Sequence, residues 1–522
     1  MDGVDETILR MAARLGLHDG SGLLLDVAGT NAEDLDQLVG QLGSSKALEA
    51  LSDACWDKDA LLISSVQGAR CLACRHDGAS RVAIFYHTLG TGGAERITLD
   101  TVRMWRAMGY EVLLLCDEGW SAGIVVDEGV TLIELPDCLS PDHDVQVSRA
   151  KALYEALASF GADVLVYCQW LSPTLAWDLL ATKLAGASFV VFTHGTTRVL
   201  TGYKNPAYLR LPSVYRHADG VVCLSEEDAR FWGAVNPNVH RVVNKVDDAF
   251  LEMPKPPLSG HRICWVGRVS YDKAPLEMLE VLSLVRKDVP DATLLVAGPF
   301  GDCSQQHYQA RSEELGVLDG VELLGDVAHH DLPELLASCD VVVFTSHMEG
   351  YPVAVAEAMA MGVPCALYNL SHLTLLEGAR GALTAPIGDV GCLASQGTRL
   401  LTDKNLARQL GVDARAHVFE LQSFDLEAFW DDLFESVAEH DGAPHKLGAE
   451  VACTLYEIGR AQQADSSRCV ELETRLSETQ SSLRETERAL QDVWNSLSLK
   501  VGRLVTLPMR ALRDAGSKVL TH

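Results

Sequence analysis

The stretch that decides the fold is residues 340–357, DVVVFTSHMEGYPVAVAE. It opens with a short apolar run that predicts a buried strand, and residues 353–361 predict a helix. Pro352 suits the first helical position, because its missing N–H costs nothing there and its φ is already helical. A strand that leads through a turn into a helix places the turn at the carboxyl edge of a sheet, where open α/β folds bind ligands. Glu349 and Glu357 are therefore expected to face one crevice.

This turn combines features that suit a phosphate with features that suit hydroxyl groups. Gly350 lets the backbone approach a ligand closely, and the N–H groups at the helix start attract phosphate. Carboxylates beside a phosphate site accept hydrogen bonds from hydroxyls. The combination suggests a sugar nucleotide, with sugar hydroxyls on one glutamate and ribose on the other. The spacing of the two glutamates, taken alone, also fits a solvated helix face.

The longer string from Glu349 to Pro364 resembles the Glu-x7-Glu signature of retaining glycosyltransferases of family 4. The resemblance implies an α/β protein of the GT-B fold, with two Rossmann-like parallel-sheet domains facing across a cleft. It also implies a nucleoside-diphosphate sugar as donor substrate. The residues expected to bind this donor are Glu349, Gly350, Tyr351, Pro352, Val353 and Glu357. Tyr351-Pro352 stands where many relatives have Phe-Gly, which leaves the donor sugar open.

A second motif supplies two cations. Residues 267–275, GRVSYDKAP, follow a predicted strand, so Arg268 and Lys273 stand at its carboxyl end. Arginine grips phosphate oxygens with a planar fork, and lysine adds a compact charge. In isolation the two residues could also be surface cations near a turn. The stretch resembles the donor-diphosphate motif of the same family, which places both cations on the leaving nucleotide.

A third motif opens the first domain. Residues 87–96, HTLGTGGAER, form a glycine-rich turn before a helix, and such turns present N–H groups to anions. The segment resembles the Gly-Gly-Ala-Glu-Arg sequence with which many family members face the donor phosphate. Gly92 and Gly93 are therefore expected at the donor. Glu95 and Arg96 could simply be a surface ion pair.

Two polar residues end other predicted elements. His194 follows the predicted strand 189–193 and faces the presumed cleft, where family members carry a histidine near the donor sugar and the acceptor. A lone histidine in such a place is often structural. Asn244 resembles the asparagine that ends the family's first domain, and we interpret it as a hinge or structural residue. The family has no firmly placed enzymic nucleophile, so we assign His194 and Glu349 catalytic roles in sugar orientation and charge stabilisation.

The order of predicted elements indicates two domains with parallel sheets, because strands alternate with helices. The expected strands are Arg81–Tyr86, Glu111–Cys116, Val164–Cys168, Phe189–Thr193, Gly220–Leu224, Arg262–Val266, Ala292–Ala297, Val321–Leu324, Val341–Phe344 and Pro364–Leu367. The predicted organisation is a helical extension of unknown role (1–78), an acceptor-side Rossmann-like domain (79–247), a proline-containing linker (248–260), a nucleotide-sugar-binding domain (261–425), a closing helix (426–447), a long helix or coiled coil (448–498) and a basic amphipathic tail (499–522).

Composition narrows the class of protein. The 522 residues carry a formal charge of −29, which argues against nucleic acid as a partner. Most of the 14 cysteines are isolated and no secretory signal opens the chain, so a reducing cytoplasm is expected. Cys71 and Cys74 could begin a zinc site, but no second pair follows at usable spacing, and free thiols are the preferred interpretation. No apolar run reaches the roughly 18 residues of a membrane helix.

The end of the chain changes character. Residues 469–497 place apolar side chains in alternating steps of three and four, a heptad seam that could join two chains in a homodimer. One long helix packed on its own enzyme is the alternative. Residues 499–522 contain five Lys or Arg and one Asp among leucines and valines, which suits an anionic membrane surface. A plain surface tail remains the alternative there.

The favoured function is a retaining, hexosyltransferase-type glycosyltransferase that uses no metal and no other cofactor. Two cations, a glycine turn and a helix start supply the positive charge that the leaving diphosphate needs. The expected acceptor is a glycan or lipid-linked hydroxyl in bacterial cell-envelope polysaccharide synthesis, with optional peripheral attachment at the inner face of the plasma membrane. A sugar-nucleotide epimerase, a phosphorylase on the same fold and a non-catalytic scaffold are the alternatives.

Overall fold

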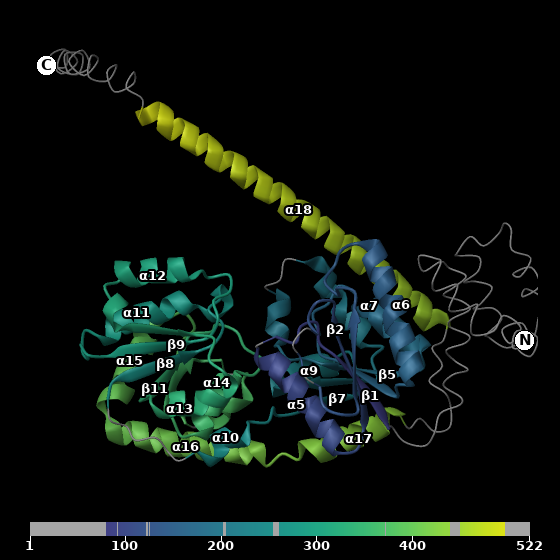
Figure 1. Cartoon of the computed structure of the whole chain (residues 1–522), viewed down its shortest axis with the longest axis horizontal. Helices are drawn as coiled ribbons and strands as arrows, with labels where there is room; N and C mark the ends of the chain where they lie inside the picture. The colour runs from purple at the N-terminus through teal and green to yellow at the C-terminus, as the bar shows by residue number, and fades with distance from the viewer. Residues whose placement is uncertain are drawn as a thin grey trace, which may run out of the picture. The chain divides into compact units, whose positions relative to one another are not determined.

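A computed structural model of the chain describes residues 80–495, except for 91, 122–123, 125, 202–204, 254–259, 371, 380 and 439–448 (Figure 1). The predicted helical extension 1–78, the pair Cys71 and Cys74, the prolines of the linker and the tail 499–522 lie outside the described residues. Among the helices that are described, none is both long enough and apolar enough to cross a bilayer.

Within the described residues, the first sheet has seven parallel strands in the order β3-β2-β1-β4-β5-β6-β7. They are β1 (Arg81–Phe85), β2 (Glu111–Asp117), β3 (Val130–Leu135), β4 (Val164–Tyr167), β5 (Ser188–Phe192), β6 (Gly220–Cys223) and β7 (Val239–Arg241). Ile84 of β1 is in register with Leu114 on one side and with Val166 on the other. The strand order reverses its direction beside β1, and such a reversal opens a crevice at the carboxyl edge.

The second sheet repeats this arrangement with six described strands in the order β10-β9-β8-β11-β12-β13. They are β8 (Arg262–Val266), β9 (Thr293–Ala297), β10 (Val321–Gly325), β11 (Val341–Phe344), β12 (Cys365–Tyr368) and β13 (Ala382–Ala385). The reversal here lies between β8 and β11. These are the strands that precede the two motifs with the predicted cations and glutamates.

Helices cover both faces of each sheet (Figure 1). The described helices are α5 (Gly93–Ala107), α6 (His143–Phe160), α7 (Leu175–Leu184), α8 (Leu211–Tyr215), α9 (Glu226–Gly233), α10 (Asp248–Glu252), α11 (Pro275–Val285), α12 (Gln305–Glu314), α13 (Leu332–Ala337), α14 (Val353–Ala360), α15 (Val390–Thr402), α16 (Lys404–Gln422), α17 (Leu426–Ala438) and α18 (Ala449–Asn495). In strand β1, coverage of both sheet faces is reflected in the sequence. Val82 and Ile84 pack into one core, whereas Ala83 and Phe85 pack into another. Burial on both faces explains its unbroken apolar run.

The first domain is completed by the end of the chain. Trp430 of α17 makes an edge-on contact with Trp105 of α5, with ring centroids 5.1 Å apart. The first turns of α18 pack on the opposite face, where the rings of Tyr456 and Trp177 lie 5.2 Å apart. The chain therefore runs from the first domain into the second and then returns to the first.

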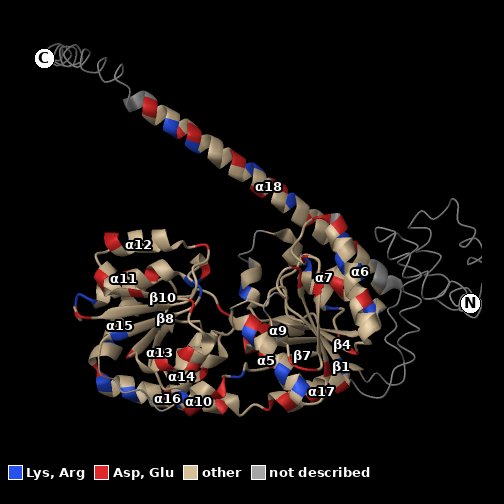
Figure 2. Cartoon of the chain, in the orientation of Figure 1, with Lys and Arg blue, Asp and Glu red and all other residues tan. Residues whose placement is uncertain are grey.

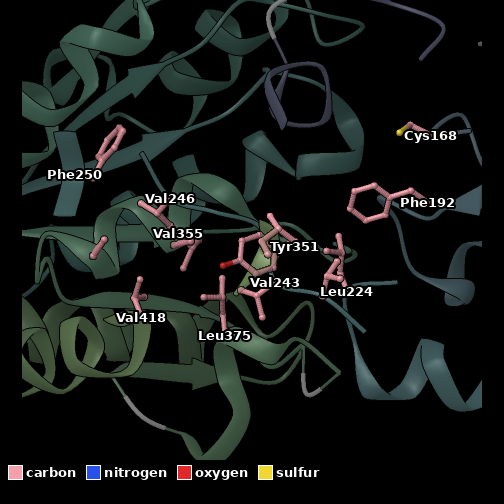
Figure 3. Packing of buried hydrophobic residues seen from close by; sticks show 14 of the residues in the cluster. Cys168, Phe192, Leu224, Val243, Val246, Phe250, Tyr351, Val355, Leu375 and Val418 are labelled. Carbon is pink, nitrogen blue, oxygen red and sulfur yellow. The ribbon is translucent and has the colours of Figure 1, made fainter. Parts of the chain in front are cut away.

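One apolar cluster continues from the first domain into the second (Figure 3). Tyr351, Val243 and Leu375 lie together in the middle of this view, and Val355 of α14 extends the cluster. The short helix α10 lies in the predicted linker and buries Phe250 in the same cluster. The start of this predicted linker therefore packs as part of the core.

From Ala464 onward, α18 belongs to a separate compact unit. Basic and acidic residues are interspersed along the helix (Figure 2). Leu472, Leu476, Leu483 and Leu490 of this unit are between 52 and 64% exposed. Their spacing is that of the predicted heptad seam.

Candidate active site

A cavity of about 790 Å³ lies between the two Rossmann-like domains. Its walls come from the loops after β1 and β5 of the first domain and after β8, β9, β10 and β11 of the second. These loops stand at the carboxyl ends of their strands. The two strand-order reversals therefore contribute to one shared site.

Most residues predicted from the sequence line this cavity. They are Gly92, Gly93, His194, Arg268, Lys273, Glu349, Tyr351, Pro352, Val353 and Glu357. Asn244, interpreted as a hinge or structural residue, also reaches the wall, and its carbonyl oxygen accepts a hydrogen bond from Gln422 Nε2 at 3.1 Å. Helix α14 begins at Val353, with Pro352 as its extended N-cap rather than as its first residue.

Gly350 has a different environment from the one expected. A Cβ atom added to it would lie 2.4 Å from the carbonyl oxygen of His194 and 2.7 Å from Cα of Gly195. Glycine is needed here because two backbone segments, one from each domain, approach closely. The structure places Gly350 at this domain contact and not on the cavity wall. Its small size therefore allows the two domains to approach each other and does not serve direct contact with a ligand.

Lys273 is fixed by its backbone and by two carboxylates. Its carbonyl oxygen accepts a hydrogen bond from Thr345 Oγ1 at 2.9 Å, and the next residue, Ala274, has a left-handed φ of 47°. Such backbone strain in a residue other than glycine is common at functional sites. Lys273 Nζ lies 2.8 Å from Glu349 Oε1 and 3.4 Å from Asp272 Oδ2. Burial alone would lower the pKa of Lys273, but these carboxylates outweigh it and the pKa is raised.

Glu357 is held by one residue from each domain. Arg96 Nη1 of α5 lies 2.7 Å from Glu357 Oε1, and His329 Nε2 lies 3.0 Å from the same oxygen. The carboxylate is only 2% exposed. His329 was not singled out in the sequence. Its position in the turn after the predicted strand 321–324 could have indicated a site residue, because that turn lies at the carboxyl edge of the sheet.

Glu95 and Arg96 do not form the surface pair considered above. Glu95 Oε1 faces Arg268 Nη2 across the cleft at 3.7 Å, while Arg96 reaches Glu357. Each of these two neighbouring residues thus pairs with a residue of the opposite charge on the other domain. Two ion pairs bridge the cavity in this way.

His194 enters the cavity from the end of β5. Its ring lies against Phe192, with centroids 4.1 Å apart, and its buried Nε2 atom makes no hydrogen bond to the described residues. Burial lowers the pKa of His194 to about 3. The imidazole is therefore neutral at physiological pH and can offer a hydrogen bond without a charge.

The described residues include one group that could ligate a metal ion, formed by Asp117, Asp137 and Cys138. Asp117 is already paired with Arg149 at 2.7 Å, and none of the three lines the cavity. The cavity itself combines cations, carboxylates and a helix start. This arrangement can hold an anionic leaving group beside a polyhydroxyl group.

Two domain families match the two halves of this fold. Residues 92–245 match the glycosyl transferase 4-like domain, and residues 252–417 match glycosyl transferases group 1. An exopolysaccharide phosphotransferase of Streptomyces coelicolor is 24% identical over 312 residues, which cover 58% of this chain and 31% of that protein. A glycogen synthase of Mycobacterium tuberculosis is 31% identical over 158 residues, 29% of this chain and 37% of that one. The alignments thus span about a third of these first relatives.

A third relative is matched over most of its length. The UDP-Gal:alpha-D-GlcNAc-diphosphoundecaprenol alpha-1,3-galactosyltransferase of Escherichia coli is 23% identical over 345 residues, 60% of this chain and 86% of that protein. Among solved structures, sucrose-phosphate synthase from Thermosynechococcus elongatus has a TM-score of 0.56 at 20% identity, covering 67% of this chain and 97% of its own. HepE from Anabaena, in complex with UDP and glucose, has a TM-score of 0.56 at 17% identity, with 67% and 99% coverage. The chain therefore carries a glycosyl transferase 4-like domain followed by a glycosyl transferases group 1 domain, arranged in the GT-B fold.

Proposed function

We propose that the protein transfers a sugar, with retention of configuration, from a nucleoside-diphosphate sugar to an acceptor hydroxyl. The acceptor class is a glycan or a lipid-linked glycan of cell-envelope polysaccharide synthesis. The observation that carries the proposal is that Arg268, Lys273, Glu349 and Glu357 line one cavity. A solvated helix face or a pair of surface cations would not bring these residues to one shared space.

In this proposal, the two ends of the donor use different parts of the cavity. The diphosphate lies at Arg268, Lys273 and the start of α14, where positive charge is concentrated. Glu357 accepts hydrogen bonds from ribose hydroxyls. Glu349 accepts one from the sugar, and its pairing with Lys273 at 2.8 Å fixes its direction. The sugar then points toward His194 of the first domain.

In the transfer step, the bond between the sugar C1 atom and the leaving phosphate oxygen breaks on the same face as the new bond forms. The acceptor oxygen attacks C1, and its proton moves to the leaving diphosphate. Arg268 and Lys273 stabilise the negative charge that grows on that diphosphate. The neutral His194 orients the sugar and takes no proton. Because these groups supply the positive charge, we propose that no metal ion is required.

The nucleotide-sugar specificity is best approached with a direct screen. Purified protein is incubated with UDP-, GDP- and ADP-sugars, and release of nucleoside diphosphate is followed with and without EDTA. Slow donor hydrolysis that resists EDTA is expected. Loss of activity with EDTA, restored by Mn²⁺ or Mg²⁺, would contradict a metal-free mechanism. Product formation that requires inorganic phosphate would favour a phosphorylase, and conversion without nucleoside diphosphate release would favour an epimerase.

The basic residues of 499–522 support a location for this activity at an anionic membrane surface. Each Lys or Arg near an anionic leaflet contributes about 1 kcal/mol, so residues 499–522 could hold an acidic enzyme at the membrane. Co-sedimentation of the full chain with anionic vesicles at low salt, and not of a chain truncated after residue 498, is expected. Equal pelleting of both forms would show that this segment is not the anchor. Activity on a soluble acceptor analogue should persist in the truncated chain.

The exposed leucines of α18 support homodimer formation through residues 469–497. The heptad spacing of Leu472, Leu476, Leu483 and Leu490 matches the narrow seam of a two-stranded coiled coil. Light scattering should therefore report a dimer for the full chain. Replacing Leu476 and Leu483 by Glu should give a monomer with the same donor hydrolysis rate. A monomer before substitution would rule out this interface.

A further inference from the structure

Glu95 occupies space that an anionic ligand would otherwise use. Its carboxylate lies over Gly92, because a Cβ atom added at Gly92 would be 2.0 Å from Glu95 Oε2. Thr88 Oγ1 donates a hydrogen bond to Glu95 Oε1 at 3.1 Å, and the residue is only 7% exposed. The side chain is thus held in place at the glycine turn. Among the described residues, no Lys or Arg of its own domain forms an ion pair with Glu95, and a buried carboxylate without such a partner is unusual.

The cation nearest to Glu95 belongs to the other domain. Arg268 Nη2 is 3.7 Å from Glu95 Oε1, and Arg268 is the residue that the proposed function places on the donor diphosphate. A diphosphate at Arg268 and at the glycine turn would meet the negative charge of Glu95. Two anions at one cation repel each other, so the carboxylate must withdraw or weaken the binding.

Arg96 has the opposite relation to the donor. It holds Glu357, the proposed ribose ligand, at 2.7 Å, and its Nε atom lies 3.8 Å from Asp100 Oδ2 of the same helix. Arg96 and His329 both contact the Oε1 atom of Glu357, which leaves Oε2 for a ribose hydroxyl. Arg96 is thus placed to fix the direction of Glu357 and to connect donor binding with the first domain.

We propose that Glu95 and Arg96 adjust donor binding in opposite directions. Glu95 takes the place of the diphosphate on Arg268 when the site is empty and returns when the product is ready to leave. Arg96 is a positioning residue that strengthens donor binding through Glu357. This inference rests on the proposed function, because it assumes that Arg268 binds the diphosphate and that Glu357 binds the ribose.

The test is calorimetric binding of UDP, with ADP and GDP in parallel, to the full chain and to two variants. Glu95→Gln keeps the shape and the hydrogen bond to Thr88 but removes the charge. We expect it to tighten nucleoside diphosphate binding about three- to tenfold, and Arg96→Gln to weaken it by a similar factor. In turnover assays Glu95→Gln should also be inhibited more strongly by its nucleoside diphosphate product. The matching nucleoside, which has no phosphate, should bind Glu95→Gln and wild type equally.

Helix α9 of the same domain offers a matched control. Glu226 and Arg230 pair with each other at 3.3 Å on the surface, and neither lines the cavity. Glu226→Gln and Arg230→Gln should leave binding unchanged, and thermal unfolding should confirm that all four variants are folded.

The signs of the two effects decide the matter. Weaker diphosphate binding in Glu95→Gln would make Glu95 a donor ligand and overturn the proposal, as would unchanged binding in either variant. The proposed function fails separately, if wild-type protein binds nucleoside diphosphates but neither transfers nor hydrolyses any donor sugar. In that case opposite shifts in the two variants would still support the exchange of anions at Arg268.

Discussion

Two groups of ion pairs in this protein use the same residue types in different surroundings. In the first domain, Arg149 of α6 is fully buried and pairs with Asp117 at 2.7 Å and with Asp178 at 3.0 Å. All three residues belong to one domain, and none lines the cavity. In the cleft, Arg96 and Arg268 pair with carboxylates of the opposite domain, and both arginines line the cavity.

The two groups differ in whether a ligand can replace one of the paired side chains. The buried group is closed by additional hydrogen bonds, because Tyr167 and Thr174 both donate to Asp178 Oδ2. These side chains lie in the interior of the domain, away from solvent and from the cavity. In the cleft, an anionic ligand can take the place of a carboxylate on its arginine, because the ligand and the carboxylate carry the same charge. In this protein, the ion pairs of the candidate site are those that join the two domains at the cavity.

The largest effect should follow from breaking the buried group. Arg149→Met leaves Asp117 and Asp178 buried without their cation, and the free energy of unfolding should fall by about 3–5 kcal/mol. Arg81→Met is the control, since its pair with Glu111 is about half exposed and should contribute only about 0–1 kcal/mol. Denaturant unfolding measures both changes. Equal stability of the two variants would remove the distinction between the groups.

The next effect concerns activity without stability. Arg268→Ala should lower kcat/KM by about 100- to 1,000-fold, because charge on the leaving diphosphate would lose a stabilising partner. Its unfolding temperature should stay close to that of wild type, since Arg268 is 54% exposed. Lys273→Ala should show a similar loss of activity. Arg311→Ala, which removes a surface pair with Glu280 in the same domain, should leave kcat/KM unchanged. A large loss of stability in Arg268→Ala would place it with the buried group.

A smaller loss is expected from the carboxylates of the cleft. A hydrogen bond to a charged group contributes about 1.5–3 kcal/mol, so Glu349→Gln should reduce transfer by about 10- to 100-fold. Glu357→Ala should raise the donor KM more than it lowers kcat. Steady-state kinetics with the identified donor separates these outcomes, and Glu280→Gln serves as the control. Transfer within twofold of wild type in both variants would remove the glutamates from the site.

The effect that is smallest at neutral pH is a pH dependence of stability, which develops only as the pH falls. Burial lowers the pKa of His194 to about 3, whereas an unfolded histidine titrates near 6.5. Between these values the unfolded chain binds a proton that the folded chain does not bind. Stability should therefore fall as the pH drops from about 6.5 toward 3, and this contribution is constant above 6.5. The unfolding temperature of His194→Gln should fall less steeply than that of wild type. Parallel curves would mean that His194 is solvated.

The central strands of both sheets could be predicted because burial on two faces leaves an unbroken apolar run. All ten expected strands have counterparts within about one residue of the observed bounds. The strands that were not expected are β3, β7 and β13, and each lies at the edge of its sheet. Edge strands have one flank without a neighbour, so their sequences mix exposed and buried positions. Val130–Leu135 is an example, since only Leu135 is fully buried.

The site was predictable where a motif stays within one segment. Residues 349–357 and 267–275 are local, and the sheet edge brings them together. Contacts across the cleft were not predictable, because Arg96 and Glu357 are 261 positions apart in the sequence. The same holds for Gly350, whose small size is required by the His194 backbone in the other domain. Local sequence could not distinguish that contact from the approach of a ligand.

The return of the chain to its first domain has a consequence for biosynthesis. Trp430, Phe434, Leu455 and Tyr456 belong to the cores of the first domain, yet they are among the last described residues to be translated. The second domain lies between the two parts of the first, so all of its strands have left the ribosome before those side chains appear. Domains usually fold in the order of their synthesis. Here the second domain can form its sheet and the cluster that lies within it first, while both faces of the first sheet stay incomplete until α17 and α18 are made.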